Sequence, residues 1–377
     1  MRNPFKPTAG AEPPILIGRD DVVLAFEEGL DNGCGAPGRL MRISGPRGSG
    51  KTVLLNDLGD RARDAGWKVV DVSAGSDFLS DLFHELAPQR ELSGAKVSLN
   101  LPFASGEVSL VQDEPSLRDL IRKASESSAG LLVTVDEVQD AELGQMQTVA
   151  HAVQHLIREG KDVAFVFAGL PMGVADLING KAMTFLRRAL SEELGAINIQ
   201  EVSLSLGDSF RGTGMDVSKD VLSELAEATG GYPYLIQLVG YYVWQRARIH
   251  HDDNPVVTSQ DVSEGVSIAM SRFHEAVHEP AISGLSSAAV DYLRAMARDP
   301  GPSSAKDLAA RLGRSTKSLS SVRRQLIQRQ VIEPVRRGYV DFAIPFMREY
   351  LLENETMDAE TFETYFADSG ENGESRV

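Results

Sequence analysis

The sequence of 377 residues is poor in cysteine, in long apolar runs and in positive charge. Its single cysteine, Cys34, excludes an internal disulfide framework and fits a reducing compartment. No run approaches the roughly 18 apolar residues that a membrane-spanning helix needs. The polar start at residues 1–7 has no apolar stretch behind it, so a secretory signal peptide is not expected. These absences predict a cytoplasmic protein that has no membrane partner.

The scarcity of positive charge gives a formal net charge of −16 at pH 7. That balance argues against a general affinity for nucleic acid. The charge is uneven, however. Residues 301–348 hold ten Lys and Arg against three Asp and Glu, a local balance of +7, whereas residues 349–377 hold nine acids against one Arg, a balance of −8. A basic module therefore precedes an acidic end.

The composition is that of a globular protein, with 42% hydrophobic residues, and the length suggests two or three domains. Apolar runs that predict strands alternate with amphipathic patterns that predict helices over residues 15–205. The run at residues 131–135 is continuous, as in a strand buried within a parallel sheet. We expect an α/β domain with a parallel sheet flanked by helices, its strands lying at residues 39–44, 67–72, 131–135 and 163–168, with a further candidate at 197–202.

Residues 45–52 match in full the phosphate-loop pattern G-x-x-x-x-G-K-[ST]. Glycines let the backbone turn its N–H groups toward phosphate oxygens, and the helix that follows adds the positive end of its dipole. Lys51 would reach the β and γ phosphates, and the Thr52 hydroxyl would bind Mg²⁺. An ordinary glycine-rich turn is the alternative, but the flanking strand and helix patterns favour a site for ATP and Mg²⁺. The expected nucleotide-binding residues are Gly45, Pro46, Arg47, Gly48, Ser49, Gly50, Lys51, Thr52 and Val53.

Two carboxylates, Asp136 and Glu137, end the apolar run at residues 131–135. In a phosphate-loop domain we expect such a strand beside the strand that enters the loop. Asp136 would then orient the Mg²⁺ shell, and Glu137 would be the general base for the attacking water. A solvated strand end is the alternative, and the loop upstream favours the catalytic role. Gln139 and Asp140 follow, either to order this turn or as a solvated helix start.

Taken in order, four segments resemble the AAA+ ATPases, specifically their Orc1/Cdc6-like and STAND-like branch. They are residues 17–20, the phosphate loop, residues 135–137 and residues 229–235, and the resemblance covers residues 15–275. It implies that Gly18 and Arg19 lie near the adenine. It also implies a helical lid in which Gly231 and Pro233 pack on the base or ribose, with a plain helix-breaking turn as the alternative.

The resemblance further implies an arginine that stabilises phosphate charge, in the same chain or from a neighbouring subunit of a homo-oligomer. It maps to Arg187 or Arg188, of which Arg188 is assigned the catalytic role, and a surface helix is the alternative. The chain departs from the family pattern at residues 168–171, which lack the usual Asn, Ser or Thr that orients the water. No Arg follows Pro233 until Arg246. Both gaps predict slow hydrolysis and favour a nucleotide-gated switch over a fast motor.

Residues 286–344 resemble a winged helix-turn-helix domain, with helical patterns at 286–298, 304–312 and 315–329 before two strand patterns at 331–335 and 339–344. The third helix would enter the major groove of double-stranded DNA, and the wing would meet phosphates. Contacts are expected from Lys317, Ser320, Ser321, Arg324, Arg336 and Arg337. The local charge of +7 favours DNA, whereas the total of −16 and the acidic end favour a protein partner.

The predicted domains are a disordered N-terminus (1–14), an AAA+ core (15–205), a helical lid (206–284), a winged helix-turn-helix (285–352) and an acidic flexible tail (353–377). Residues 96–111 alternate around Gly106 and predict an inserted hairpin. His250 and His251 are expected to be a solvated helix end, because no cysteine or spaced carboxylate partner is evident.

The leading hypothesis is an ATP-binding, slowly hydrolysing ATPase that acts as a nucleotide-dependent switch on DNA. A signalling ATPase that binds protein partners is the second. A metabolic kinase is the third, although the sequence offers no separate catalytic constellation for a small acceptor.

Overall fold

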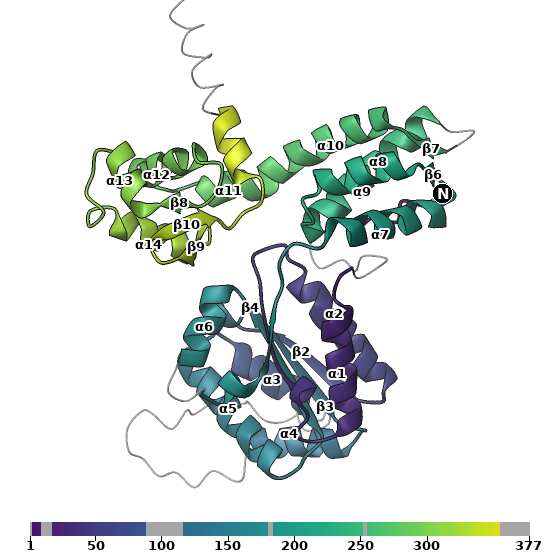
Figure 1. The fold of residues 1–377 in the computed structure, drawn as a ribbon. Coiled ribbons are helices and arrows are strands. Elements are labelled where there is room, and N and C mark those ends of the chain that lie inside the picture. Colours follow the sequence, from purple (N-terminus) through teal and green to yellow (C-terminus); the bar gives the residue numbers. More distant parts are fainter. Residues whose placement is uncertain (1, 9–16, 88–115, 180–183, 252–254, 355–377) are drawn as a thin grey trace, which may run out of the picture. The chain divides into compact units, whose positions relative to one another are not determined.

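A computed structural model describes residues 2–8, 17–87, 116–179, 184–251 and 255–354. The chain forms two compact units, Met1–Met215 and Asp216–Val377 (Figure 1). The hairpin predicted at residues 96–111 lies outside the described residues, as do residues 355–377 of the predicted tail. No helix in the described ranges is long and apolar enough to cross a bilayer.

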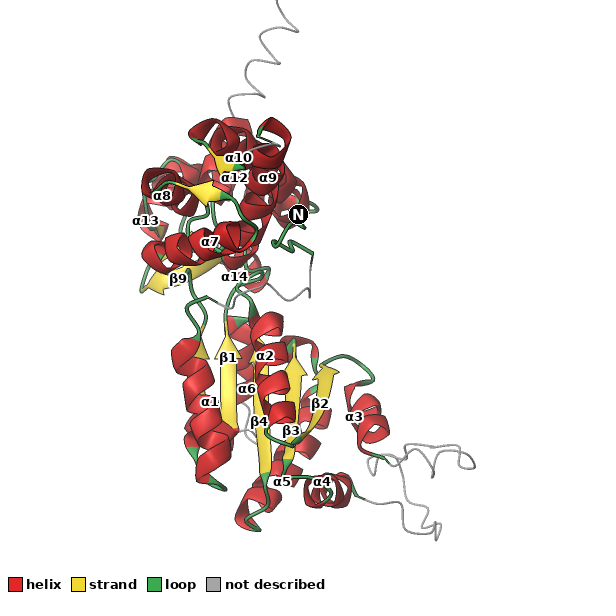
Figure 2. Ribbon diagram, turned by 90° about the vertical axis from the view of Figure 1, so that its right-hand side faces the viewer, coloured by secondary structure: helices red, strands yellow, loops and turns green. Residues whose placement is uncertain are grey.

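The centre of the first unit is a five-stranded parallel sheet with the strand order β2-β3-β4-β1-β5 (Figure 2). This confirms the predicted α/β fold. β4 is buried along its whole length and lies between β3 and β1, so the expectation that the acidic strand adjoins the first strand is wrong. Because the strands are parallel, their carboxyl ends still share one edge. The bounds are β1 Leu40–Ser44, β2 Lys68–Ser73, β3 Leu131–Asp136, β4 Val163–Gly169 and β5 Leu190–Glu193.

Helices cover both faces of this sheet because alternate strand residues point to opposite sides. In β3, Leu132 packs with α1 and α2, whereas Leu131, Val133 and Val135 pack with α3, α4, α5 and α6 (Figure 1). The helices are α1 Asp20–Asn32, α2 Lys51–Asp64, α3 Phe78–Leu86, α4 Leu117–Glu126, α5 Leu143–Arg158 and α6 Pro171–Asn179, with short helices η1 Pro37–Arg39, η2 Val138–Asp140 and η3 Thr184–Arg188.

The last helix of the first unit is α7, Ile199–Gly212, and it corrects the strand predicted at residues 197–202. The Asn198 side chain accepts a hydrogen bond from the Gln200 backbone N–H at 2.8 Å and so caps the helix. The buried residues Val202, Leu206 and Phe210 then follow a helical spacing. Phe5 is only 3% exposed, and its ring centroid lies 5.2 Å from that of Phe210, so the predicted disorder of residues 1–14 is wrong at Phe5.

The second unit begins with three helices, α8 Lys219–Ala228, α9 Pro233–His250 and α10 Ser259–Phe273, and with a parallel pair of two-residue strands, β6 Asp216–Val217 and β7 Val256–Val257. Gly230 and Gly231 both have positive φ (56° and 71°) and form the predicted break before α9. α10 packs closely on α9, since a Cβ atom added to Gly265 would lie 2.5 Å from the Val243 side chain.

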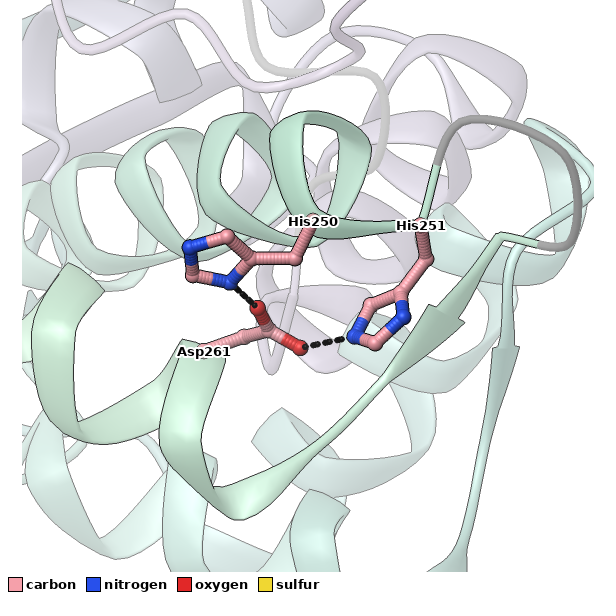
Figure 3. Close-up of side chains that lie close together, drawn as sticks. All are labelled: His250, His251 and Asp261. Carbon is pink, nitrogen blue, oxygen red and sulfur yellow. Dashed lines mark hydrogen bonds and ion pairs between the residues drawn. The ribbon is translucent and has the colours of Figure 1, made fainter.

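Asp261, at the start of α10, links this helix to the two histidines at the end of α9 (Figure 3). Its carboxylate is fully buried, accepts from the Thr258 backbone N–H at 2.8 Å, and lies 2.7 Å from His250 Nδ1 and 3.4 Å from His251 Nε2. Burial alone would raise the pKa of Asp261, but the bonds from Thr258 and His250 outweigh it and lower that pKa. The expectation that both histidines are merely solvated is therefore wrong, because they share a buried carboxylate partner.

In its described residues, the rest of the second unit holds four longer helices and a three-stranded antiparallel sheet of order β8-β10-β9. This order of elements is consistent with the predicted winged helix-turn-helix. α14 starts five residues later than predicted, because residues 315–319 form a turn in which Ser315 Oγ accepts from the Ser318 N–H at 3.1 Å. The elements are η4 His274–His278, α11 Glu279–Ile282, α12 Ser287–Ala297, β8 Ser303–Ser304, α13 Ala305–Arg311, α14 Ser320–Gln328, β9 Ile332–Arg336 and β10 Tyr339–Phe342, and residues 347–354 are helical.

Candidate nucleotide-binding site

The phosphate loop connects β1 to α2 at the carboxyl edge of the parallel sheet. Gly48 and Gly50 have φ of 74° and 88°, a conformation that glycine adopts without strain. Gly50 is the N-cap of α2 and provides no side-chain bond, so the first N–H groups of the helix stay available to an anion. A Cβ on Gly45 would lie 2.5 Å from Ser49 Oγ and 2.8 Å from the Leu194 carbonyl oxygen. The loop is therefore closed too tightly for a side chain at Gly45.

Lys51 is held inside this loop. Its ammonium donates to the carbonyl oxygens of Gly45 at 3.0 Å and Pro46 at 3.1 Å, and the residue is only 6% exposed. Burial lowers the pKa of Lys51, and the carboxylates of Glu137 and Asp136 oppose that shift. A buried ammonium with three N–H donors and two carbonyl partners suits an additional anionic ligand.

The Ser49 hydroxyl also indicates that the loop suits a bound phosphate. Its oxygen is buried and has no hydrogen-bond partner in the described structure. Buried hydroxyls normally have a partner, because an unpaired one costs free energy of desolvation. An unpartnered donor, a buried ammonium and an uncapped helix N-terminus together are the donor set that a polyphosphate requires.

Thr52 and Asp136 meet across the sheet edge. The Thr52 hydroxyl donates to Asp136 Oδ2 at 2.6 Å, and Asp136 Oδ1 accepts from the Glu137 backbone N–H at 2.8 Å. A hydroxyl and a carboxylate are oxygen ligands of the kind that Mg²⁺ prefers. The two residues predicted to hold the metal thus lie together in the structure.

Glu137 follows in the left-handed region, with φ of 53°, which is uncommon for a residue with a side chain. Such conformations cost free energy and cluster at functional sites. One carboxylate oxygen of Glu137 accepts from the Gln139 side-chain amide at 2.5 Å. The predicted general base is therefore fixed through both its backbone and its side chain.

The segment predicted to approach the adenine lies beside the phosphate loop. Arg19 donates to the carbonyl oxygens of Gly195 at 3.1 Å and of Ser49 at 3.4 Å. Burial lowers its pKa, and Glu201 opposes that shift. Gly18 has φ of 62°, and a Cβ there would lie 2.8 Å from Glu201 Oε2. Contact of Gly18 and Arg19 with a base stays a prediction.

The remaining predicted nucleotide contacts come from η3 and from the second unit. Arg187 and Arg188 are both exposed on η3, and Arg187 donates to the Ile178 carbonyl oxygen at 3.4 Å. Within the described ranges, no hydrogen bond or ion pair links Arg188 to the phosphate loop. Pro233 is the first residue of α9 in the second unit, and Gly231 precedes it. The roles of Arg188, Gly231 and Pro233 stay predictions.

The predicted DNA contacts are solvent-exposed side chains of the second unit: Lys317, Ser320, Ser321, Arg324, Arg336 and Arg337. Ser320, Ser321 and Arg324 lie on α14, and Lys317 lies in the turn before it. Arg336 and Arg337 lie at the turn between β9 and β10. The Arg336 guanidinium lies 4.0 Å from the centre of the Tyr339 ring, and this cation–π contact orients the exposed arginine side chain.

Gln139 lies beside Glu137, and the sequence left open whether it orders this turn or only starts a solvated helix. Its side-chain amide contacts Glu137 and also accepts from the Leu170 backbone N–H at 3.0 Å. The sequence contained a clue in Gly169 and Gly173, whose missing side chains make room for it.

Comparison with known proteins supports this site. Residues 37–178 match the AAA domain family, and residues 275–351 match a family described as a domain of unknown function (DUF8462). No curated protein matches the sequence.

Among solved structures, the chain is similar to the ORC2 protein of Aeropyrum pernix in ADPNP–ADP complexes, with a TM-score of 0.62 and 14% identity over 94% of this chain and 98% of that one. A Walker-type ATPase of Pyrococcus abyssi gives a TM-score of 0.60 and 18% identity over 89% and 96% of the two chains. A variant of RuvB from Thermotoga maritima gives 0.50 and 14% over 89% and 95%. Identities this low establish the fold alone.

Proposed function

We propose that the protein, whose residues 37–178 match the AAA domain family, binds ATP with Mg²⁺ at residues 45–53 and hydrolyses it slowly. In this proposal the bound nucleotide controls whether residues 285–352 engage double-stranded DNA. The observation that carries the proposal is the convergence of Lys51, the Thr52–Asp136 pair and Glu137 at one edge of the sheet.

Each side chain has a role that its surroundings support. Lys51 neutralises charge on the β and γ phosphates, and Thr52 and Asp136 are the residues that would hold Mg²⁺. Mg²⁺ bound there supplies further neutralisation of the phosphate charge. Glu137 takes a proton from water, whose oxygen attacks the γ phosphorus. The bond from that phosphorus to the bridging oxygen breaks, and ADP and phosphate leave.

Slow hydrolysis is proposed because neither the end of β4, Ala168 and Gly169, nor Leu170 after it offers a polar side chain to a water molecule. Neither Arg187 nor Arg188 has a hydrogen bond or ion pair to the phosphate loop among the described residues. A long-lived nucleotide state suits a switch better than a motor.

Engagement of DNA is supported by the exposed residues of α14 and the β9–β10 turn. The balance of +7 over residues 301–348 concentrates positive charge in this module. Phosphate contacts of this kind add affinity without sequence preference, whereas α14 would read bases from the major groove. The ORC2 protein of Aeropyrum pernix, crystallised with ADPNP and ADP, is a nucleotide-binding protein of the same fold.

The test combines nucleotide and DNA binding. Affinity for Mg²⁺-ATP and single-turnover hydrolysis are measured for the wild type, Lys51→Ala and Glu137→Gln, with Lys123→Ala, an exposed lysine on α4, as the matched control. We expect Lys51→Ala to lose binding and Glu137→Gln to bind ATP without hydrolysis. DNA affinity is then measured at low salt with ATP, with ADP and without nucleotide. Absence of ATP binding would reject the whole proposal, and absence of DNA binding in every state would reject its second half.

A signalling ATPase that contacts protein partners is the alternative, and the net charge of −16 favours it. In that case the module at residues 285–352 and the acidic end would bind protein. Variants Arg324→Ala and Arg336→Ala that leave DNA affinity unchanged would support this alternative. Assembly into homo-oligomers is compatible with either function and is measured by light scattering with and without ATP.

A further inference from the structure

The side chain of Gln139 joins the proposed general base to the end of β4. Its amide nitrogen donates to Glu137 Oε2 at 2.5 Å, and its amide oxygen accepts from the Leu170 backbone N–H at 3.0 Å. A primary amide is uncharged and offers donors on its nitrogen and an acceptor on its oxygen. Both ends of the Gln139 amide are therefore used, and its orientation is defined.

The backbone around Gln139 is built to admit this side chain. A Cβ atom added to Gly173 would lie 2.3 Å from the Gln139 Cβ and 3.0 Å from its Cα. A Cβ atom added to Gly169 would lie 2.8 Å from the Gln139 amide oxygen. A side chain at either position would clash with the turn that holds Gln139, and at Gly169 the nearest contact would be Val138 Cγ2 at 2.6 Å. α6 and the end of β4 therefore leave space for this turn.

The bond to Gln139 fixes a carboxylate whose backbone is already constrained. Glu137 has a left-handed backbone, and its N–H is bonded to Asp136 Oδ1 at 2.8 Å. Without a partner, the Glu side chain would still sample several rotamers. A general base must lie within hydrogen-bond reach of the proton that it takes, and small displacements reduce the rate.

We infer that Gln139 is a positioning residue for ATP hydrolysis, which restrains the Glu137 carboxylate by linking it to the carboxyl end of β4. β4 itself ends without a polar side chain, so Gln139 brings an amide to that edge from the neighbouring turn. This inference rests on the proposed function, because it assumes that Glu137 activates water. It adds a residue that is expected to affect turnover and not nucleotide affinity.

The test measures kcat and KM for Mg²⁺-ATP hydrolysis by the full chain, the dissociation constant of a fluorescent ATP analogue, and the melting temperature. Gln139→Ala removes both bonds. Gln139→Glu keeps the size and the acceptor for Leu170, and replaces the donor to Glu137 with a carboxylate whose negative charge repels it. Gly173→Ala displaces Gln139 without changing its chemistry. The matched controls are Gln154→Ala and Gly144→Ala, both on α5. A Cβ atom added at Gly144 would meet nothing within 4 Å.

We expect kcat to fall about tenfold or more in all three test variants, with analogue affinity within about twofold of the wild type. The controls are expected to keep the wild-type kcat. Unchanged or increased kcat in Gln139→Glu would overturn the inference, as would a loss of affinity parallel to the loss of kcat. A wild type that binds ATP and never hydrolyses it would overturn both the inference and the proposed hydrolysis. A Lys51→Ala variant that still binds ATP would instead count against the proposed nucleotide site.

Discussion

The Thr52 hydroxyl and the Asp136 carboxylate are 84 residues apart in sequence and 2.6 Å apart in the fold. Asp136 is the last residue of β3, whereas Thr52 lies in the first turn of α2, which follows β1 and the phosphate loop. The parallel sheet brings both to one edge. The bond orients both oxygens toward the same place. A metal that binds there would replace the shared proton as the link between them.

Asp136→Asn is expected to lower the affinity for ATP in the presence of Mg²⁺ by about tenfold or more, because one charged oxygen ligand is lost. Binding of ATP in EDTA should change little, since Lys51 and the loop N–H groups are intact. Isothermal titration with and without Mg²⁺ checks this, with the exposed Asp140→Asn as the control. Equal losses with and without Mg²⁺ would show that Asp136 acts on the fold of the loop and not on the metal.

The phosphate loop and the two carboxylates after β3 are predictable from sequence because their chemistry depends on contiguous residues. Gly48, Gly50 and Lys51 form the loop through their own backbone preferences, and the apolar run before Asp136 requires a buried strand. The position of β4 between β1 and β3 is different. It depends on how the helices cover each face, and no short segment encodes it.

Other parts of the site depend on side chains that meet only after folding. His250 and His251 have their partner in Asp261, which begins a separate helix, so no local spacing marks the group. Gln139 lies two residues after Glu137 in sequence, but its second bond goes to Leu170 and its space comes from Gly173. The misjudged strand at residues 197–202 shows a further limit. Alternating Ile197 and Ile199 match a strand until Asn198 caps a helix.

The buried Asp261 carboxylate is expected to contribute strongly to the stability of the second unit. Asp261→Ala should lower the free energy of unfolding by about 2 to 3 kcal/mol, because it removes the Asp261 half of the capping box of α10 and leaves the Thr258 N–H without its acceptor. The chain has two tryptophans, and Trp244 lies in the second unit. Urea unfolding followed by fluorescence in a Trp67→Phe background therefore reports on this unit, with the exposed Glu224→Gln as the control.

The protein is expected to lose stability at mildly acidic pH because of the buried His278. It is fully buried, its Nε2 donates to the Pro345 carbonyl oxygen at 2.8 Å, and its Nδ1 has no partner in the described structure. Burial lowers its pKa to about 4, and the neighbouring His274 adds to the shift. The pKa of His274 is itself lowered by burial, with Glu353 and Glu279 opposing. The folded state thus binds fewer protons than the unfolded state between about pH 4 and pH 6.5.

Stability should therefore fall as the pH drops through this range, by about 2 kcal/mol between pH 7 and pH 5 for His278 alone. The same Trp244 fluorescence measures unfolding at both values. His278→Gln keeps an N–H for Pro345 and does not titrate, so its stability should depend less on pH. A His278→Gln variant with the wild-type pH dependence would assign the effect to His274 or to other groups.

Two exposed arginines of the basic module are expected to contribute to DNA binding in different ways. Arg324 lies on α14 and Arg336 at the end of β9, and both are exposed. If Arg336 meets phosphates, Arg336→Ala should weaken binding to all duplexes about equally and lower the slope of log affinity against log salt by about 1. If Arg324 reads a base, Arg324→Ala should cost about 1 to 3 kcal/mol on a preferred duplex and less on others. Fluorescence anisotropy over a salt series separates the two roles. Arg158→Ala, on an exposed face of α5, is the control for a simple change in net charge. Equal effects of all three substitutions would mean that only the overall charge matters, and that α14 does not enter a groove.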